Sequence, residues 1–204
     1  MKKDIRKNIE KGVIFGLVCA VILGFARFEA RLDELRDGVL RLHILANSDS
    51  DFDQRLKLKV RDRILEVTAA SLENAGNIDE AISIAEADMG KITAAAKEVV
   101  SSEGCDYEVS ANIEKNFFEN RVYDDFTLPA GVYNSLTVRI GAANGHNWWC
   151  VIFPGVCLPC AKKGELEAAV SRGSAQVAQN ASRYRMRFKA AEIYEKIKRK
   201  FSKK

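Results

Sequence analysis

An uncharged run of fifteen residues, from Gly12 to Ala26, follows a lysine-rich start. This pattern is typical of a signal peptide or an N-terminal membrane anchor in residues 1–27. As a helix, the run spans roughly 22 Å, which is shorter than the ~30 Å hydrocarbon layer but within reach of a thinned bilayer. Gly24 and Ala26 favour cleavage after Ala26, while retention as an anchor and burial inside a cytosolic domain stay open. We expect the function to lie outside the cytoplasm.

The net charge of +4 hides basic ends around an acidic body. Residues 1–26 carry +3 and residues 183–204 carry +8, so residues 27–182 carry −7. An acidic body argues against nucleic acid as a partner, although the whole chain has a basic balance.

The segment 161–204 predicts a linker followed by a basic amphipathic helix between about Ser174 and Phe201. Its apolar stripe includes Tyr184, Phe188 and Ile197. Basic helices of this kind bind anionic membrane surfaces, and they also pack their stripe against their own domain. The sequence leaves both interpretations open.

Four cysteines follow the apolar run: Cys105, Cys150, Cys157 and Cys160. In an oxidising compartment, the simplest pairing is a small disulfide loop between Cys150 and Cys157, although four cysteines allow three pairings. Cys157 and Cys160 also form a C-x-x-C pair, which suits thiol-disulfide chemistry or half of a zinc site. An extracytoplasmic thiol-disulfide or metal-binding protein is therefore the alternative function.

Hydrophobic periodicity predicts an α+β fold in which two helices pack on a mostly antiparallel sheet. The N-terminal segment and the basic C-terminal helix flank this body, which covers residues 38–160. We expect the last two strands to form a hairpin around Asn144 and Gly145. The expected elements are strands at 39–46, 107–113, 133–140 and 148–153, and helices from about 51 to 72 and from about 79 to 103.

The polar turn after the first strand predicts a helix start. Ser50 and Asp53 have the spacing of an N-cap and its third helical position, and Phe52 begins the apolar stripe. The alternating aspartates also imitate the start of a calcium loop, but Gln54 and Val60 occupy the positions that such a loop reserves for Gly and Glu. We interpret the turn as a helix cap.

The sequence offers little for catalysis. It has two histidines, His43 on a predicted strand and His146 in a predicted turn, and it has neither a nucleophile elbow nor a phosphate loop. We therefore assign no catalytic residue, cofactor or metal ligand.

Three long motifs, in order, resemble the SpoIIR family (stage II sporulation protein R). They are RLHILANSDSDFDQRLKLKVRD at 41–62, LPAGVYNSLTVRIG at 128–141 and GHNWWCVIFPGVC at 145–157. The resemblance covers about residues 39–160. Pro154 and Gly155 replace a double proline of the family, and Cys160 and the basic tail fall outside the match.

The resemblance implies an exported signalling protein of endospore formation. Such a protein crosses the forespore membrane into the intermembrane space, or stays anchored to that membrane by residues 12–26. It activates a membrane-embedded, SpoIIGA-like aspartic-type protease, which then processes the sigma-E precursor. The resemblance therefore implies a ligand of a protease and not an enzyme, in agreement with the signal sequence and with the lack of a catalytic motif.

We expect the partner-binding surface to combine the acidic turn after the first strand with the start of the last strand. Adjacent tryptophans on a strand point to opposite faces, so one of them is a candidate anchor, although burial of both in the core is the more common outcome for tryptophan. The candidate residues are Asn47, Asp49, Asp51, Arg41, His43, Asn147, Trp148 and Trp149.

Overall fold

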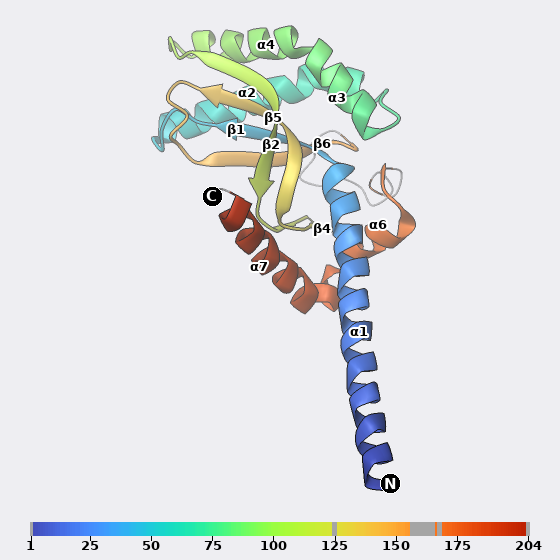
Figure 1. Ribbon diagram of the computed structural model, residues 1–204. Helices are drawn as coiled ribbons and strands as arrows, with labels where there is room; N and C mark the ends of the chain where they lie inside the picture. Colours follow the sequence, from blue (N-terminus) through green and yellow to red (C-terminus); the bar gives the residue numbers. More distant parts are fainter. Residues whose placement is uncertain (1, 124–125, 156–165, 167–168, 203–204) are drawn as a thin grey trace.

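Strand β1 (Leu40–Leu45) lies inside a four-stranded sheet with the order β2–β5–β1–β6. The computed structural model describes residues 2–123, 126–155, 166 and 169–202 (Figure 1). β5 (Gly131–Ile140) runs parallel to β1, β2 (Val109–Phe118) runs antiparallel to β5, and β6 (Asn147–Phe153) runs antiparallel to β1. The predicted α+β fold with a mostly antiparallel sheet is therefore confirmed.

The predicted hairpin between the last two strands is wrong, because β1 separates β5 from β6. Ile44 of β1 is in register with Val138 of β5 on one side and with Trp148 of β6 on the other. The connection of residues 141–146 crosses the C-terminal end of β1 instead of folding β6 back onto β5. Strands that follow one another in the sequence usually pair, and the prediction relied on that tendency.

Three helices cover one face of the sheet: α2 (Asp51–Leu72), α3 (Ile78–Ala87) and α4 (Met89–Ser102) (Figure 1). Alternate residues of β1 point to this side and are fully buried. They pack against the apolar stripe of α2 in a first core that includes Leu40, Leu42, Ile44, Leu56, Val60 and Ile64.

The predicted second helix is two helices, because the chain breaks at Asp88. This residue ends α3 and precedes α4, with φ −86° and ψ 3° outside the helical range. Its buried carboxylate accepts a 2.6 Å hydrogen bond from Lys91, which holds the break in place. The apolar spacing continues across the break, so periodicity alone did not reveal it.

The opposite face carries a second core beneath helices that the sequence did not assign to the body. They are the last turns of α1 (Lys2–Asp37), α6 (Arg172–Gln179), the 3₁₀ turn η1 (Ala181–Tyr184) and α7 (Arg185–Ser202). A small hairpin of β3 (Arg121–Val122) and β4 (Thr127–Leu128) borders them. The buried members include Phe28, Leu32, Leu35, Phe118, Tyr133, Val151 and Phe188.

Helix α1 joins this core to the apolar N-terminal run without interruption. Its first part projects from the body as an exposed stalk (Figure 1), and its last turns are held by buried Arg36, which pairs with Glu29 and Asp33 at 2.7 Å. The stretch Asn8–Asp37 is long and apolar enough to cross a membrane, and a signal sequence meets the same criteria.

Candidate functional site

Two chain segments meet at the C-terminal end of β1. Gly145 N donates to Ala46 O at 2.9 Å, and Asn144 N donates to Asn47 O at 3.2 Å. The side chain of Asn47 adds a bond, because its Oδ1 accepts from Ala142 N at 2.9 Å. We call residues 46–53 and 141–147 together the β1-end surface. The structure thus brings the acidic turn beside the start of β6, and its use as a partner-binding surface stays a prediction.

Two glycines allow this close approach. Gly141 has φ +56°, and a Cβ on it would overlap the side chain of Asn47. A Cβ on Gly145 would overlap the main-chain oxygen of Ser48. The two segments therefore touch through backbone, which makes the surface rigid.

Buried Asp53 holds the turn from below. Its Oδ2 accepts hydrogen bonds from Ser48 Oγ at 2.5 Å and from Asn47 Nδ2 at 2.9 Å, and its own N–H donates to Ser50 Oγ at 3.1 Å. The predicted N-cap at Ser50 is thus confirmed. Burial alone would raise the pKa of the Asp53 carboxyl, but the bonds from Ser48 and Asn47 outweigh it and hold that pKa below its usual value.

Lys57 ties helix α2 to the β5–β6 connection. Its side chain is buried, and Nζ donates to Gln54 Oε1 at 2.6 Å and to His146 O at 2.9 Å. Burial lowers the pKa of this ammonium group. His146 also contacts the carboxylate of Asp49 through its ring Nδ1. Lys57 is a charged residue outside the apolar stripe of α2, so hydrophobic periodicity does not reveal this link.

The exposed part of the β1-end surface combines charged, amide and aromatic side chains. Asp49, Asp51, His146 and Asn147 are exposed, and Phe52 is 38% exposed beside them. The sequence predicts that Phe52 begins the apolar stripe that packs on the core, but its side chain is exposed and lies outside the first core. An exposed apolar ring among acids is a feature that partner-binding surfaces use as an anchor.

Arg41 and His43 point to the other side of β1, into the second core. The guanidinium of Arg41 is fully buried and lies over the rings of Phe118 and Tyr133, with its Cζ 4.0 and 4.9 Å from their centroids. Its Nε and Nη1 have no hydrogen-bond partner in the described part of the chain. Arg41 is therefore inaccessible to a partner in this structure.

His43 is half-buried next to the same aromatic group. Its Nε2 is 3.0 Å from Asn147 Oδ1, and its ring contacts Phe118 and Trp149 edge to face. Burial lowers the pKa of the His43 imidazole below its usual value of 6.5, so the ring is neutral at pH 7.

The two tryptophans point to opposite faces of β6, as predicted. Trp148 packs on the first core under the guanidinium of Arg61, whose Cζ is 4.5 Å from the ring centroid. Trp149 packs on the second core, 5.5 Å from the ring of Phe118. Both are half-buried and pack on a core, so neither stands fully exposed, and a role for either as an anchor stays a prediction.

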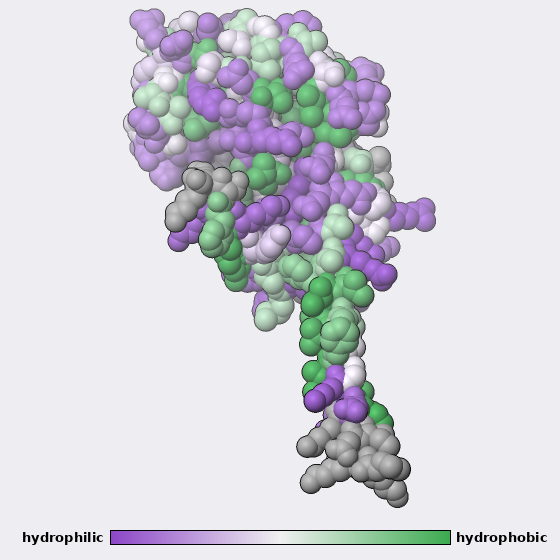
Figure 2. Space-filling model, viewed as in Figure 1, coloured by the Kyte–Doolittle hydropathy of each residue, from purple (hydrophilic) through white to green (hydrophobic). Residues whose placement is uncertain are grey.

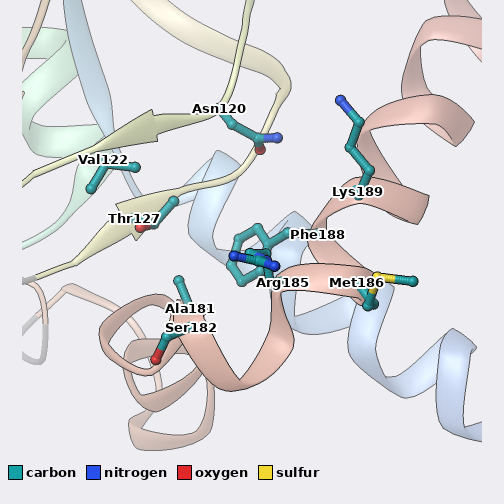
Figure 3. A pocket seen from close by; sticks show the side chains of 9 residues that line it. All are labelled: Asn120, Val122, Thr127, Ala181, Ser182, Arg185, Met186, Phe188 and Lys189. Carbon is teal, nitrogen blue, oxygen red and sulfur yellow. The ribbon is translucent and has the colours of Figure 1, made fainter.

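A further hollow of about 550 Å³ lies between the β3–β4 hairpin and η1–α7 (Figure 3). Its wall is mainly apolar, with Arg185 and Lys189 among its lining residues. Among the described residues, its lining contains no acid, histidine or cysteine. The described residues hold no cluster of three or more metal-ligating side chains. Cys157 and Cys160, with the predicted Cys150–Cys157 disulfide, lie outside the described residues.

Comparison with known proteins identifies the family. The family model for stage II sporulation protein R matches residues 36–163, which include all three motifs and the β1-end surface. The chain is also 35% identical over 158 residues to Stage II sporulation protein R of Bacillus subtilis (strain 168), covering 74% of this chain and 70% of that relative. No solved structure matches the chain. The chain therefore belongs to the stage II sporulation protein R family.

Proposed function

We propose that this protein is an exported signal of endospore formation that activates a membrane-embedded aspartic-type protease by binding to it. In this proposal the protease is SpoIIGA-like and processes the sigma-E precursor. The protein acts from the space between the forespore and mother-cell membranes, either released or held by residues 12–26. The observation that carries the proposal is the rigid β1-end surface inside the segment that the family model matches.

A ligand activates a protease by binding its active conformation more tightly than its resting one. Shifting a population from 1:99 to 99:1 requires about 5.5 kcal/mol of differential binding free energy. A binding surface loses less conformational entropy on association when its loops are already ordered. Backbone hydrogen bonds between the two segments, together with buried Asp53 and Lys57, provide that order at the β1-end surface.

The exposed chemistry of this surface suits a partner with basic and apolar groups. Asp49 and Asp51 offer carboxylates, Asn147 offers an amide, and Phe52 offers a ring. The body of the chain is acidic as well, so attraction to a basic partner would extend beyond the contact itself.

The test is reconstitution in a bacterium that does not sporulate. The full chain is expressed with its cognate protease and sigma precursor, and precursor cleavage is followed by immunoblot. Precursor cleavage that requires both this chain and the protease supports the proposal. The proposal is contradicted if the precursor is cleaved without this chain. It is also contradicted if no cleavage occurs when all three proteins are present and the protease is correctly inserted in the membrane. Phe52→Ser with Asp51→Lys should lower cleavage sharply, whereas Ala94→Glu on exposed α4 should leave it unchanged.

A further inference from the structure

Helix α7 has apolar side chains on two opposite sides. One side, with Phe188 and Ala191, is buried in the second core. At 100° per residue, a second stripe lies roughly opposite, and its members are 45–83% exposed. That exposed stripe consists of Met186, Ile193, Tyr194, Ile197 and Phe201. Packing against the body therefore accounts for only half of the amphipathic pattern.

Basic side chains border the exposed stripe on both margins. By helical position, Arg185, Lys189, Lys196 and Lys200 lie along one margin, and Arg187 and Lys198 along the other. The two acids of α7, Glu192 and Glu195, lie toward the body, where their side chains are 11% and 8% exposed. An apolar stripe between two cationic margins is the pattern of a helix that lies in a membrane interface.

The stripe is continuous with the apolar stalk of α1. The ring of Tyr194 contacts that of Phe25 edge to face, with centroids 6.3 Å apart. Beyond this contact, toward the N-terminus, the apolar side chains of α1 are exposed, including Phe15 at 71% and Val21 at 71%. Figure 2 shows hydrophobic atoms along the lower edge of α7 and then along the stalk. One surface thus contains both the candidate membrane span and the stripe.

We propose that α7 lies on the surface of an anionic bilayer, with its exposed stripe among the lipid headgroups, next to the point where α1 enters the membrane. The occupant follows from continuity with α1 and from charge, because anionic headgroups attract both cationic margins. The proposal does not depend on protease activation. Its consequence is orientation: two attachments prevent the body from swivelling about α1 and fix the direction in which the β1-end surface points.

The first test measures the depth of α7 in the full chain. An environment-sensitive fluorescent amino acid is placed at position 197, or at position 94 as the control, and the protein is reconstituted in vesicles with brominated lipids. We expect quenching at 197 in phosphatidylglycerol-containing vesicles, several-fold less in pure phosphatidylcholine, and none at 94. A probe at 197 that stays water-exposed in anionic vesicles overturns the proposal. So does a probe that is shielded without quenching by lipid, which would indicate a second copy or another protein over the stripe.

The second test removes the stripe while keeping the stalk. Ile193→Glu with Ile197→Glu changes two exposed side chains, so the folded body should remain, as checked by circular dichroism. In anionic vesicles, trypsin should cleave α7 several-fold more slowly in the parent chain than in this variant. Ala94→Glu, which adds a charge to the exposed side of α4, should behave like the parent. Equal cleavage in all three proteins overturns the proposal.

Discussion

Lys57 Nζ donates a 2.9 Å hydrogen bond to the main-chain oxygen of His146, across a sequence separation of 89 residues. This contact joins the helix that follows β1 to the connection that leads into β6. Together with the bonds of Gly145 and Asn144, it makes two distant motifs of the sequence one rigid surface. The account of function rests on that rigidity.

Gly145→Ala should loosen the β1-end surface. A Cβ at Gly145 overlaps the main-chain oxygen of Ser48, so the two segments must separate. We expect a loss of about 1–3 kcal/mol in the free energy of unfolding, measured with urea. Gly90→Ala is the matched control, because its Cβ meets open space on α4, and it should gain up to ~1 kcal/mol. Equal stability of the two variants would refute the close approach.

Asp53→Ala should destabilise the protein by about 1–3 kcal/mol, because the partly buried donors of Ser48 and Asn47 lose their acceptor. Exposed Asp51→Ala should cost less than ~1 kcal/mol. The pKa of Asp53 lies below its usual 3.8, so its stabilisation is complete above about pH 4 and is lost as the pH falls further. The difference in the free energy of unfolding between the parent and Asp53→Ala should therefore become smaller in acid. A difference that grows in acid would contradict the role of the Asp53 carboxylate as the acceptor.

His43 should make the protein less stable in mild acid. Its folded pKa is depressed, so the unfolded chain takes up the proton first, and stability is lost as the pH falls below about 6.5. The difference in Tm between pH 7.5 and pH 5.5 should be smaller for His43→Gln than for the parent. Ala94→Gln, at an exposed position with no titratable group, should retain the parent difference. An unchanged difference in His43→Gln would show that the ring is not the cause.

Arg41 should be replaceable by an apolar side chain of similar length. Its guanidinium is buried, and two of its nitrogens have no partner among the described residues, which costs solvation free energy that stacking on Phe118 and Tyr133 only partly offsets. We expect Arg41→Met to hold or raise the free energy of unfolding by about 1 kcal/mol. Arg41→Ala should lower it by about 2–4 kcal/mol, because it leaves a cavity. A large loss in Arg41→Met would reveal a role for the charge.

Local patterns predicted the elements around the site. Alternation along β1, the Ser50 cap and the stripe of α2 all follow from side-chain chemistry within a few residues. The placement of β1 between β5 and β6 depends on long-range packing, which periodicity does not report. The burial of Lys57 depends on a carbonyl 89 residues away, and the break at Asp88 interrupts a pattern that continues across it.

The same limit applies to the aromatic side chains. A stripe that starts at Phe52 predicts burial, but Phe52 is exposed and lies outside the first core, whereas its neighbour Asp53 is buried. The two tryptophans pack on the two cores and are half-buried. No signal in the sequence distinguishes these two outcomes.

The most direct measurement of the central claim is photo-cross-linking between this protein and the protease that it is proposed to activate. A photoreactive amino acid replaces Phe52 in the full chain, or Ala94 as the control, in cells that contain the protease and the sigma precursor. The account predicts a covalent adduct with the protease from position 52 and none from position 94, while precursor cleavage continues in both. Active cleavage with no adduct from position 52, or equal adducts from both positions, would contradict it.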